Sequence, residues 1–136
     1  MSVSPKEILD TAEKLRDGVP SESDMRSSAS RAYYAALHAA DLSIPDSFRE
    51  TTLDESTHEA TINKARRMSR SNGPGRTEAA QLFGLLPRFK RLRVKADYFI
   101  HENFDLDDCK RAIDQAIQAL SLCNTISEKL EKRKAE

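Results

Sequence analysis

Residues 82–99 have the sequence LFGLLPRFKRLRVKADYF, and the spacing of the apolar side chains in this stretch decides the fold class. The apolar residues recur three or four positions apart, at Leu82, Leu85, Phe89, Leu92, Ala96 and Phe99. This period places them on one face of an amphipathic α-helix. We expect the helix to begin at Thr77 and to end at residues 101–103. Pro87 interrupts the pattern and predicts a kink or a fresh helix start.

The same period continues on the C-terminal side of this stretch. Asp105 or Asp107 is expected to begin a long last helix, because aspartate favours helix starts. Its inner face is predicted from residues with the same spacing: Cys109, Ile113, Ala116, Leu120, Cys123 and Leu130. Residues 127–136 are rich in charge and are expected to fray.

On the N-terminal side, two helix starts are marked by capping residues. The sequence SPKE at residues 4–7 combines a serine cap, a proline at the first helical position and a glutamate, and it predicts a helix over residues 5–16. Ser21 or Ser23 is expected to cap a second helix that continues to Leu42. The many alanines of this second helix predict a close approach of a neighbouring helix.

The segments between these helices complete the expected fold. Residues 43–54 predict a polar loop, residues 55–69 a further helix, and residues 71–75, SNGPG, the strongest break in the chain. Long amphipathic helices joined by short loops are typical of antiparallel bundles. We therefore expect one all-α domain over residues 1–136, an up-and-down antiparallel bundle of four to five helices.

Composition limits the classes of protein to be considered. The chain has 136 residues with 38% apolar residues, and no apolar run approaches the ~20 residues that span a bilayer. The first residues lack a basic-then-apolar signal pattern, so we expect a cytoplasmic protein without a membrane segment. Cys109 and Cys123 would lie about 21 Å apart along one helix, too far for a disulfide. The scattered His38, His58 and His101 lack zinc-site spacing, and we expect neither a metal nor a cofactor.

Charge is balanced over the whole chain, with 22 basic and 22 acidic side chains, but it is unevenly distributed. Residues 1–63 carry 6 basic and 12 acidic side chains, residues 64–95 carry 10 and 1, and residues 96–136 carry 6 and 9. A cationic segment of this kind can attract the phosphates of RNA. The candidate RNA-binding residues are Lys64, Arg66, Arg67, Arg70, Arg88, Arg91 and Lys95. The alternatives are that these cations pair with the chain's own acidic segments or with an acidic partner.

Two groups of polar residues lie on helices that should otherwise be apolar inside. Arg93 and Asp97 are four residues apart, Tyr98 follows, and His101 lies four residues beyond Asp97. An arginine for phosphate charge, a histidine or tyrosine for proton transfer and an orienting aspartate are a plausible metal-free ribonuclease set. The structural alternative is a helix-surface ion pair between Arg93 and Asp97.

The second group lies earlier in the chain. Arg31 and His38 are seven residues apart, about 20° short of two helical turns, so they share a helix face. Tyr34 lies between them on the same stripe. We regard Arg31 and His38 as secondary catalytic candidates. The structural alternative is that Arg31 pairs with a carboxylate from another helix while the tyrosines anchor the core.

Two motifs together identify a family resemblance. The sequence SRAYYAALHAAD at residues 30–41, followed by LRVKADYFIHENFDLDDCKRAIDQAIQAL at residues 92–120, resembles the prokaryotic branch of the HEPN (higher eukaryotes and prokaryotes nucleotide-binding) family. The resemblance covers roughly residues 5–125. It implies an all-α bundle, frequently a homodimer, in bacterial or archaeal defence or toxin–antitoxin systems with a nucleotidyltransferase-like antitoxin partner. Many members are metal-independent endoribonucleases that use Arg-x4–6-His near the dimer cleft.

The family motif matches this sequence only in part. Arg93 lies where the motif arginine falls, and Tyr98 occupies the position of the nearest histidine spacing. His101 follows Arg93 with seven intervening residues. Arg31 and His38 match Arg-x6-His literally, but in the earlier helix.

Two hypotheses about function follow from the sequence. In the first, the chain is a metal-free RNA-cleaving effector, with Arg93 stabilising phosphate charge and His101 or His38 moving the proton. In the second, it is a non-catalytic HEPN module that binds nucleotide, nucleic acid or a partner protein.

Overall fold

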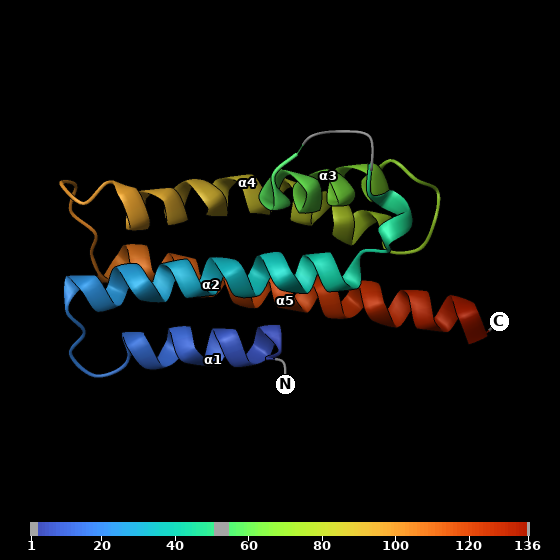
Figure 1. The fold of residues 1–136 in the computed structure, drawn as a ribbon. Helices are drawn as coiled ribbons and strands as arrows, with labels where there is room; N and C mark the ends of the chain where they lie inside the picture. Colours follow the sequence, from blue (N-terminus) through green and yellow to red (C-terminus); the bar gives the residue numbers. More distant parts are fainter. Residues whose placement is uncertain (1–2, 51–54, 136) are drawn as a thin grey trace.

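The chain folds into a bundle of helices, as the apolar spacing predicts. The computed structural model describes residues 3–50 and 55–135, and no β-strand occurs in these ranges. Their elements are α1 (Pro5–Arg16), α2 (Glu22–Ser43), the 3-10 turn η1 (Asp46–Phe48), α3 (Thr57–Ser69), α4 (Arg76–Tyr98) and α5 (Leu106–Ala135). Figure 1 shows α1, α2, α4 and α5 side by side, with successive helices running in opposite directions. Across the described ranges, none of the helices has the length and apolar character needed to cross a bilayer.

The helix starts follow the capping residues in the sequence. Ser4 forms a capping box with Glu7, with Pro5 in the first turn of α1. Ser21, rather than Ser23, caps α2 and forms a second capping box with Asp24. These reciprocal hydrogen bonds satisfy backbone N–H groups that have no partner inside the helix.

The central helix of the bundle is α2, which packs against α1, α4 and α5 and also contacts α3. The alanines of α2 face its neighbours, because Ala29, Ala32, Ala36 and Ala40 are all buried. Small side chains allow the neighbouring helices to approach closely. The fully buried ring of Tyr33 fills part of the space between α2 and α4, with its ring centroid 5.4 Å from that of Phe89.

Helix α4 differs from its prediction at two places. It continues through Pro87, so the fresh start, one of the two predicted outcomes there, does not occur. It ends at Tyr98, earlier than residues 101–103, and the backbone leaves helical geometry at Phe99, with ψ 61°. Phe99 was predicted on the inner face, but its side chain is 50% exposed because the helix has already ended.

Helix α5 begins after Asp105, the first of the two predicted starts. The Asp108 N–H donates to Asp105 Oδ1 at 2.9 Å, and the Asp105 N–H donates to Asp108 Oδ2 at 3.2 Å. The charged tail, expected to fray, is helical as far as Ala135. Basic side chains in its last turn complement the helix dipole. Residue 136 of the tail and residues 51–54 of the predicted loop lie outside the described residues.

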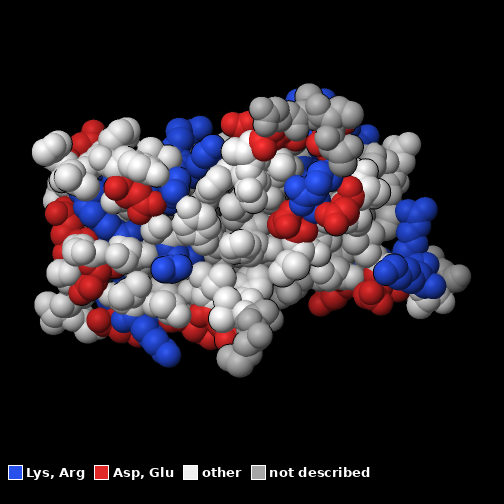
Figure 2. Space-filling model, viewed as in Figure 1, with Lys and Arg blue, Asp and Glu red and all other residues white. Residues whose placement is uncertain are grey.

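A buried lysine joins α2, η1 and α3. The Lys64 side chain is fully buried, and its Nζ donates to the Asp41 carbonyl oxygen at 3.0 Å and to Asp46 Oδ1 at 3.0 Å. Arg49 also pairs with Asp41, at 2.6 Å. A buried ammonium group needs such partners, because an unpaired charge is costly away from water. Figure 2 shows that Lys and Arg are interleaved with Asp and Glu on one face of the molecule.

Arg26 caps the C-terminal end of α4. The buried guanidinium donates through Nη1 to the carbonyl oxygens of Lys95 at 3.1 Å and Ala96 at 3.0 Å. It also donates to the carbonyls of Phe99 and Glu102 in the following turn. The last carbonyls of a helix have no partner inside it, and one arginine of α2 supplies donors to them here. Arg26 therefore positions the C-terminal end of α4.

We expect Arg26→Ala to lower the free energy of unfolding by about 2–3 kcal/mol, because it leaves several half-buried carbonyl groups without a donor. Chemical denaturation followed by circular dichroism measures this change. Arg31→Ala is the matched control, since Arg31 lies exposed on the same helix, and it should change stability by less than about 0.5 kcal/mol. Equal effects of the two substitutions would contradict the role of Arg26.

Candidate functional site

Helices α2 and α4 meet around the guanidinium group of Arg93. Arg93 Nη2 donates to Tyr34 Oη at 2.9 Å, and Nε lies 2.8 Å from Asp97 Oδ2. The Ser30 hydroxyl donates to the same oxygen of Asp97 at 3.1 Å. The Arg93 side chain is only 12% exposed, so its direction is set by these partners.

Three tyrosine rings surround the same guanidinium. Arg93 Cζ lies 5.4 Å from the ring centroid of Tyr34, 5.5 Å from that of Tyr98 and 5.9 Å from that of Tyr33. These distances are typical of cation–π contacts. Tyr33 is fully buried, whereas Tyr98 is 64% exposed, so the aromatic group extends from the core to the surface.

His58, near the start of α3, completes this group and was not among the predicted site residues. Its Nδ1 lies 2.9 Å from Tyr33 Oη, and the two rings stack with centroids 5.6 Å apart and planes at 7°. The Tyr34 ring centroid is 5.8 Å away. No partner of Nε2 occurs among the described residues. We call Arg93, Asp97, Tyr33, Tyr34, Tyr98 and His58 the Arg93 cluster.

The environment keeps both members of the His58–Tyr33 pair neutral near pH 7. Burial raises the pKa of Tyr33 to about 12, so its phenol retains the proton. Partial burial, and then the positive charges of Arg93 and Lys90, hold the pKa of His58 below its ordinary value. The cluster therefore combines one permanent cation with one neutral imidazole.

The predicted catalytic residues only partly come together. Arg93, Asp97 and Tyr98 converge, as their spacing indicates. His101 does not join them, because α4 ends at Tyr98 and the helical relation between Asp97 and His101 is absent. His101 is exposed in the turn between α4 and α5, without a hydrogen bond, ion pair or ring contact to the described residues.

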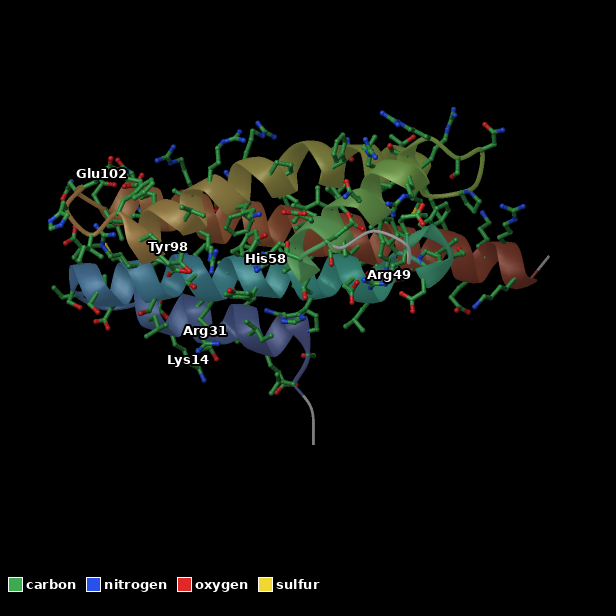
Figure 3. The ribbon with its side chains drawn as sticks, turned by 45° about the horizontal axis from the view of Figure 1, so that its top comes forward. Lys14, Arg31, Arg49, His58, Tyr98 and Glu102 are labelled. Atoms are coloured by element: carbon green, nitrogen blue, oxygen red, sulfur yellow. The ribbon has the colours of Figure 1, made fainter. Side chains whose placement is uncertain are left out.

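The secondary candidates Arg31 and His38 are both exposed, but they do not form one site. Arg31 and Lys14 both line an open cavity of about 450 Å³ between α1 and α2. Figure 3 shows Arg31 beside Lys14, on the other side of α2 from His58. The predicted pairing of Arg31 with a carboxylate is not seen among the described residues. The His38 ring lies at the edge of the Arg93 cluster, with its centroid 6.4 Å from that of Tyr34.

Three of the predicted RNA-binding residues are engaged inside the fold. Lys64 is fully buried among aspartates. Arg67 Nη1 donates to the Phe48 carbonyl at 2.7 Å, and Lys95 pairs with Asp108 at 3.3 Å. Such contacts within the chain are the alternative to RNA binding that the balanced net charge allows. For Lys64 the RNA-binding prediction is wrong, because a buried ammonium group cannot reach a phosphate.

The other four predicted RNA-binding residues form no ion pair with the described residues: Arg66, Arg70, Arg88 and Arg91. Arg70, Arg88 and Arg91 are exposed, whereas Arg66 is half-buried. A surface that attracts phosphate is therefore smaller than the charge count of residues 64–95 implies.

The cysteines and acidic residues form no further site in the described ranges. Cys109 and Cys123 are buried and free, and burial raises the pKa of Cys123 to about 11, which disfavours a reactive thiolate. Within the described part of the chain, no three histidine, cysteine, aspartate or glutamate side chains are grouped to hold a metal ion.

Comparisons of the chain with protein-family models, with curated proteins and with solved structures found no significant match.

We expect His58 to titrate below pH 6.5, its ordinary value, because burial and two nearby cations disfavour its protonated form. The imidazole C–H signals in NMR spectra recorded from pH 4.5 to 8.5 measure the midpoint, with His58→Gln identifying the signal. Lys90→Gln should raise the midpoint by removing one of the cations. A midpoint at or above 6.5 in the unmodified protein would contradict the assignment.

Proposed function

We propose that this chain is a HEPN-type cytoplasmic protein of a bacterial or archaeal defence or toxin–antitoxin system, and that the Arg93 cluster is a metal-independent RNA-cleaving site. The observation that carries the proposal is the contact network in which one cation, Arg93, and one neutral imidazole, His58, share the same tyrosine rings. The two sequence motifs support the family, since they supply Tyr34 and Ser30 from α2 and Arg93 and Asp97 from α4.

In this proposal Arg93 stabilises negative charge on a phosphate. Nη2 donates to Tyr34 Oη, Nε lies 2.8 Å from Asp97 Oδ2 without a hydrogen bond, and Nη1 has no hydrogen-bond partner among the described residues. A guanidinium group with a free edge suits phosphate oxygens, and a donor fixed in advance stabilises the charge that develops there.

His58 replaces His101 and His38 as the group that moves the proton. RNA carries its own nucleophile, the 2′-hydroxyl group, whose oxygen forms a bond to phosphorus as the bond to the 5′ oxygen breaks. His58 Nε2 accepts the 2′-hydroxyl proton, and solvent returns a proton to the 5′ oxygen. This step requires the tautomer in which Nδ1–H donates to Tyr33 Oη, leaving the Nε2 lone pair free.

The surface beside the cluster suits a second copy of the chain. Tyr98, Phe99, Ile100 and Leu106 expose between 42% and 66% of their surface around the turn between α4 and α5. Exposed apolar groups concentrated in this way mark interaction surfaces. We propose a homodimer formed through this patch, with the Arg93 cluster beside the interface. A nucleotidyltransferase-like antitoxin partner belongs to the same proposal through the family resemblance.

The second candidate function is a non-catalytic HEPN module that binds nucleotide, nucleic acid or a partner protein. It is favoured by the engagement of two Arg93 nitrogens with Asp97 and Tyr34 and by the separation of His101 from the cluster. This candidate predicts stable binding without turnover.

We expect the protein to cleave RNA in the presence of EDTA, and Arg93→Ala to reduce the rate by about 100-fold or more. Arg93→Lys should cleave RNA little faster than Arg93→Ala, because a lysine cannot keep the contacts to Asp97 and Tyr34 while donating to phosphate. His58→Gln should reduce the rate by about 100-fold. Gel assays with labelled RNA measure these rates, and His101→Ala is the control that leaves them unchanged.

The outcomes separate the two candidate functions. RNA binding without cleavage by the unmodified protein would favour the non-catalytic module. Cleavage that survives Arg93→Ala would remove the proposed site. Cleavage lost in His101→Ala and retained in His58→Gln would return the proton transfer to His101.

We expect a dimer in sedimentation equilibrium, weakened at least about 10-fold by Phe99→Asp with Ile100→Asp, since buried apolar side chains dominate such interfaces. Leu42→Asp is the control, because Leu42 is 75% exposed near the C-terminal end of α2, outside the patch. A monomeric protein, or an equal effect of the control, would contradict the proposed interface.

A further inference from the structure

A second, positively charged site lies at the other end of the bundle. The turn between α3 and α4 and the last turns of α5 border an open cavity of about 440 Å³. Its lining residues are Asn72, Pro74, Lys129, Lys132 and Arg133. Figure 1 shows this turn and the C-terminal part of α5 at the same end of the molecule. Arg93 lies about 26 Å away, measured along α4 from Arg76.

The walls of the cavity are held by packing and by one ion pair. A side chain at Gly75, where φ is 87°, would approach Met68 Cε to 3.0 Å and Ile126 to 3.6 Å, so the turn lies close against α5. Lys129 Nζ lies 2.9 Å from both carboxylate oxygens of Glu78, joining α5 to α4. A Cβ at Gly73 would lie 3.4 Å from Arg133 Nη1, which places this guanidinium group against the turn.

The charge of the cavity is not balanced by the described residues. Glu78 matches Lys129, but Lys132 and Arg133 have no described ion-pair partner. No described carboxylate lines the cavity. Arg70 and Arg76, which flank the turn, are exposed and add further positive charge. The nearby Glu131 is engaged with Lys134, at 3.9 Å.

We propose that this cavity binds a phosphate group, either as free phosphate or in the backbone of RNA. The Arg133 guanidinium offers paired donors for phosphate oxygens, Lys132 adds a mobile point charge, and the Asn72 amide adds a neutral donor. The absence of a lining carboxylate removes the main source of repulsion. This site goes beyond the proposed function, because it needs no cleavage at the Arg93 cluster.

Two titrations test the site on the full chain. In the first, inorganic phosphate replaces chloride at constant ionic strength while amide NMR signals are recorded, and the signals of Asn72, Gly73 and Gly75 should shift. In the second, fluorescence anisotropy measures the affinity for a short single-stranded 2′-O-methyl RNA, which cannot be cleaved through a 2′-hydroxyl group, at several salt concentrations. If free phosphate is the ligand, Lys132→Ala with Arg133→Ala should abolish the phosphate shifts. If the RNA backbone is the ligand, the same double substitution should weaken RNA binding about 10-fold and lower the salt slope by about 2.

The control removes the same charge elsewhere. Lys14→Ala with Lys110→Ala changes two exposed lysines without described ion pairs, and Lys110 lies about 33 Å from Lys132 along α5. It should leave both titrations nearly unchanged.

Each result has a defined meaning. Phosphate shifts without an RNA effect identify free phosphate as the ligand, and the reverse identifies the RNA backbone. Neither effect, or equal effects of the control, overturns the proposal. Arg93→Ala should retain the phosphate shifts of Asn72, Gly73 and Gly75, which lie at the other end of the bundle. A protein that binds phosphate here but does not cleave RNA would therefore contradict only the proposed function.

Discussion

The close packing of α2 against its neighbours is the constraint on which the rest of the structure depends. Six alanines of α2 are buried: Ala29, Ala32, Ala35, Ala36, Ala39 and Ala40. Because alanine extends no further than Cβ, α1, α4 and α5 can all approach the same helix. That approach brings Ser30 and Tyr34 within hydrogen-bond distance of the Arg93–Asp97 pair. A larger residue in this face would separate the two helices that form the cluster.

Charged side chains also stabilise the ends of the helices. Arg26 satisfies the carbonyls at the end of α4, and Lys64 holds η1 against α2 and α3. Both are buried, and removing one partner of a buried charge costs more than the pair contributes. Lys64, Arg67 and Lys95 of the cationic segment are therefore held inside the fold rather than presented to solvent partners.

The sequence predicts those features that depend on neighbouring residues. Capping serines located the starts of α1 and α2, and four-residue spacing brought Arg93 and Asp97 together. His101 was misplaced because its role assumed one more helical turn, whereas α4 ends at Tyr98. His58 was missed because its contact with Tyr33 depends on how α3 packs across α2, and periodicity within one helix carries no information about that packing.

The Arg93 cluster also couples Arg93 and His58 electrostatically. Partial burial, and then the positive charge of Arg93, keep the pKa of His58 low, so the free site holds a neutral ring. A phosphate bound to Arg93 would offset that charge and place negative charge near the imidazole. Both effects favour the protonated ring, so the ring's proton affinity would rise once an anionic substrate is present. An imidazole that is neutral when free and more basic when phosphate is bound is suited to accepting a hydroxyl proton.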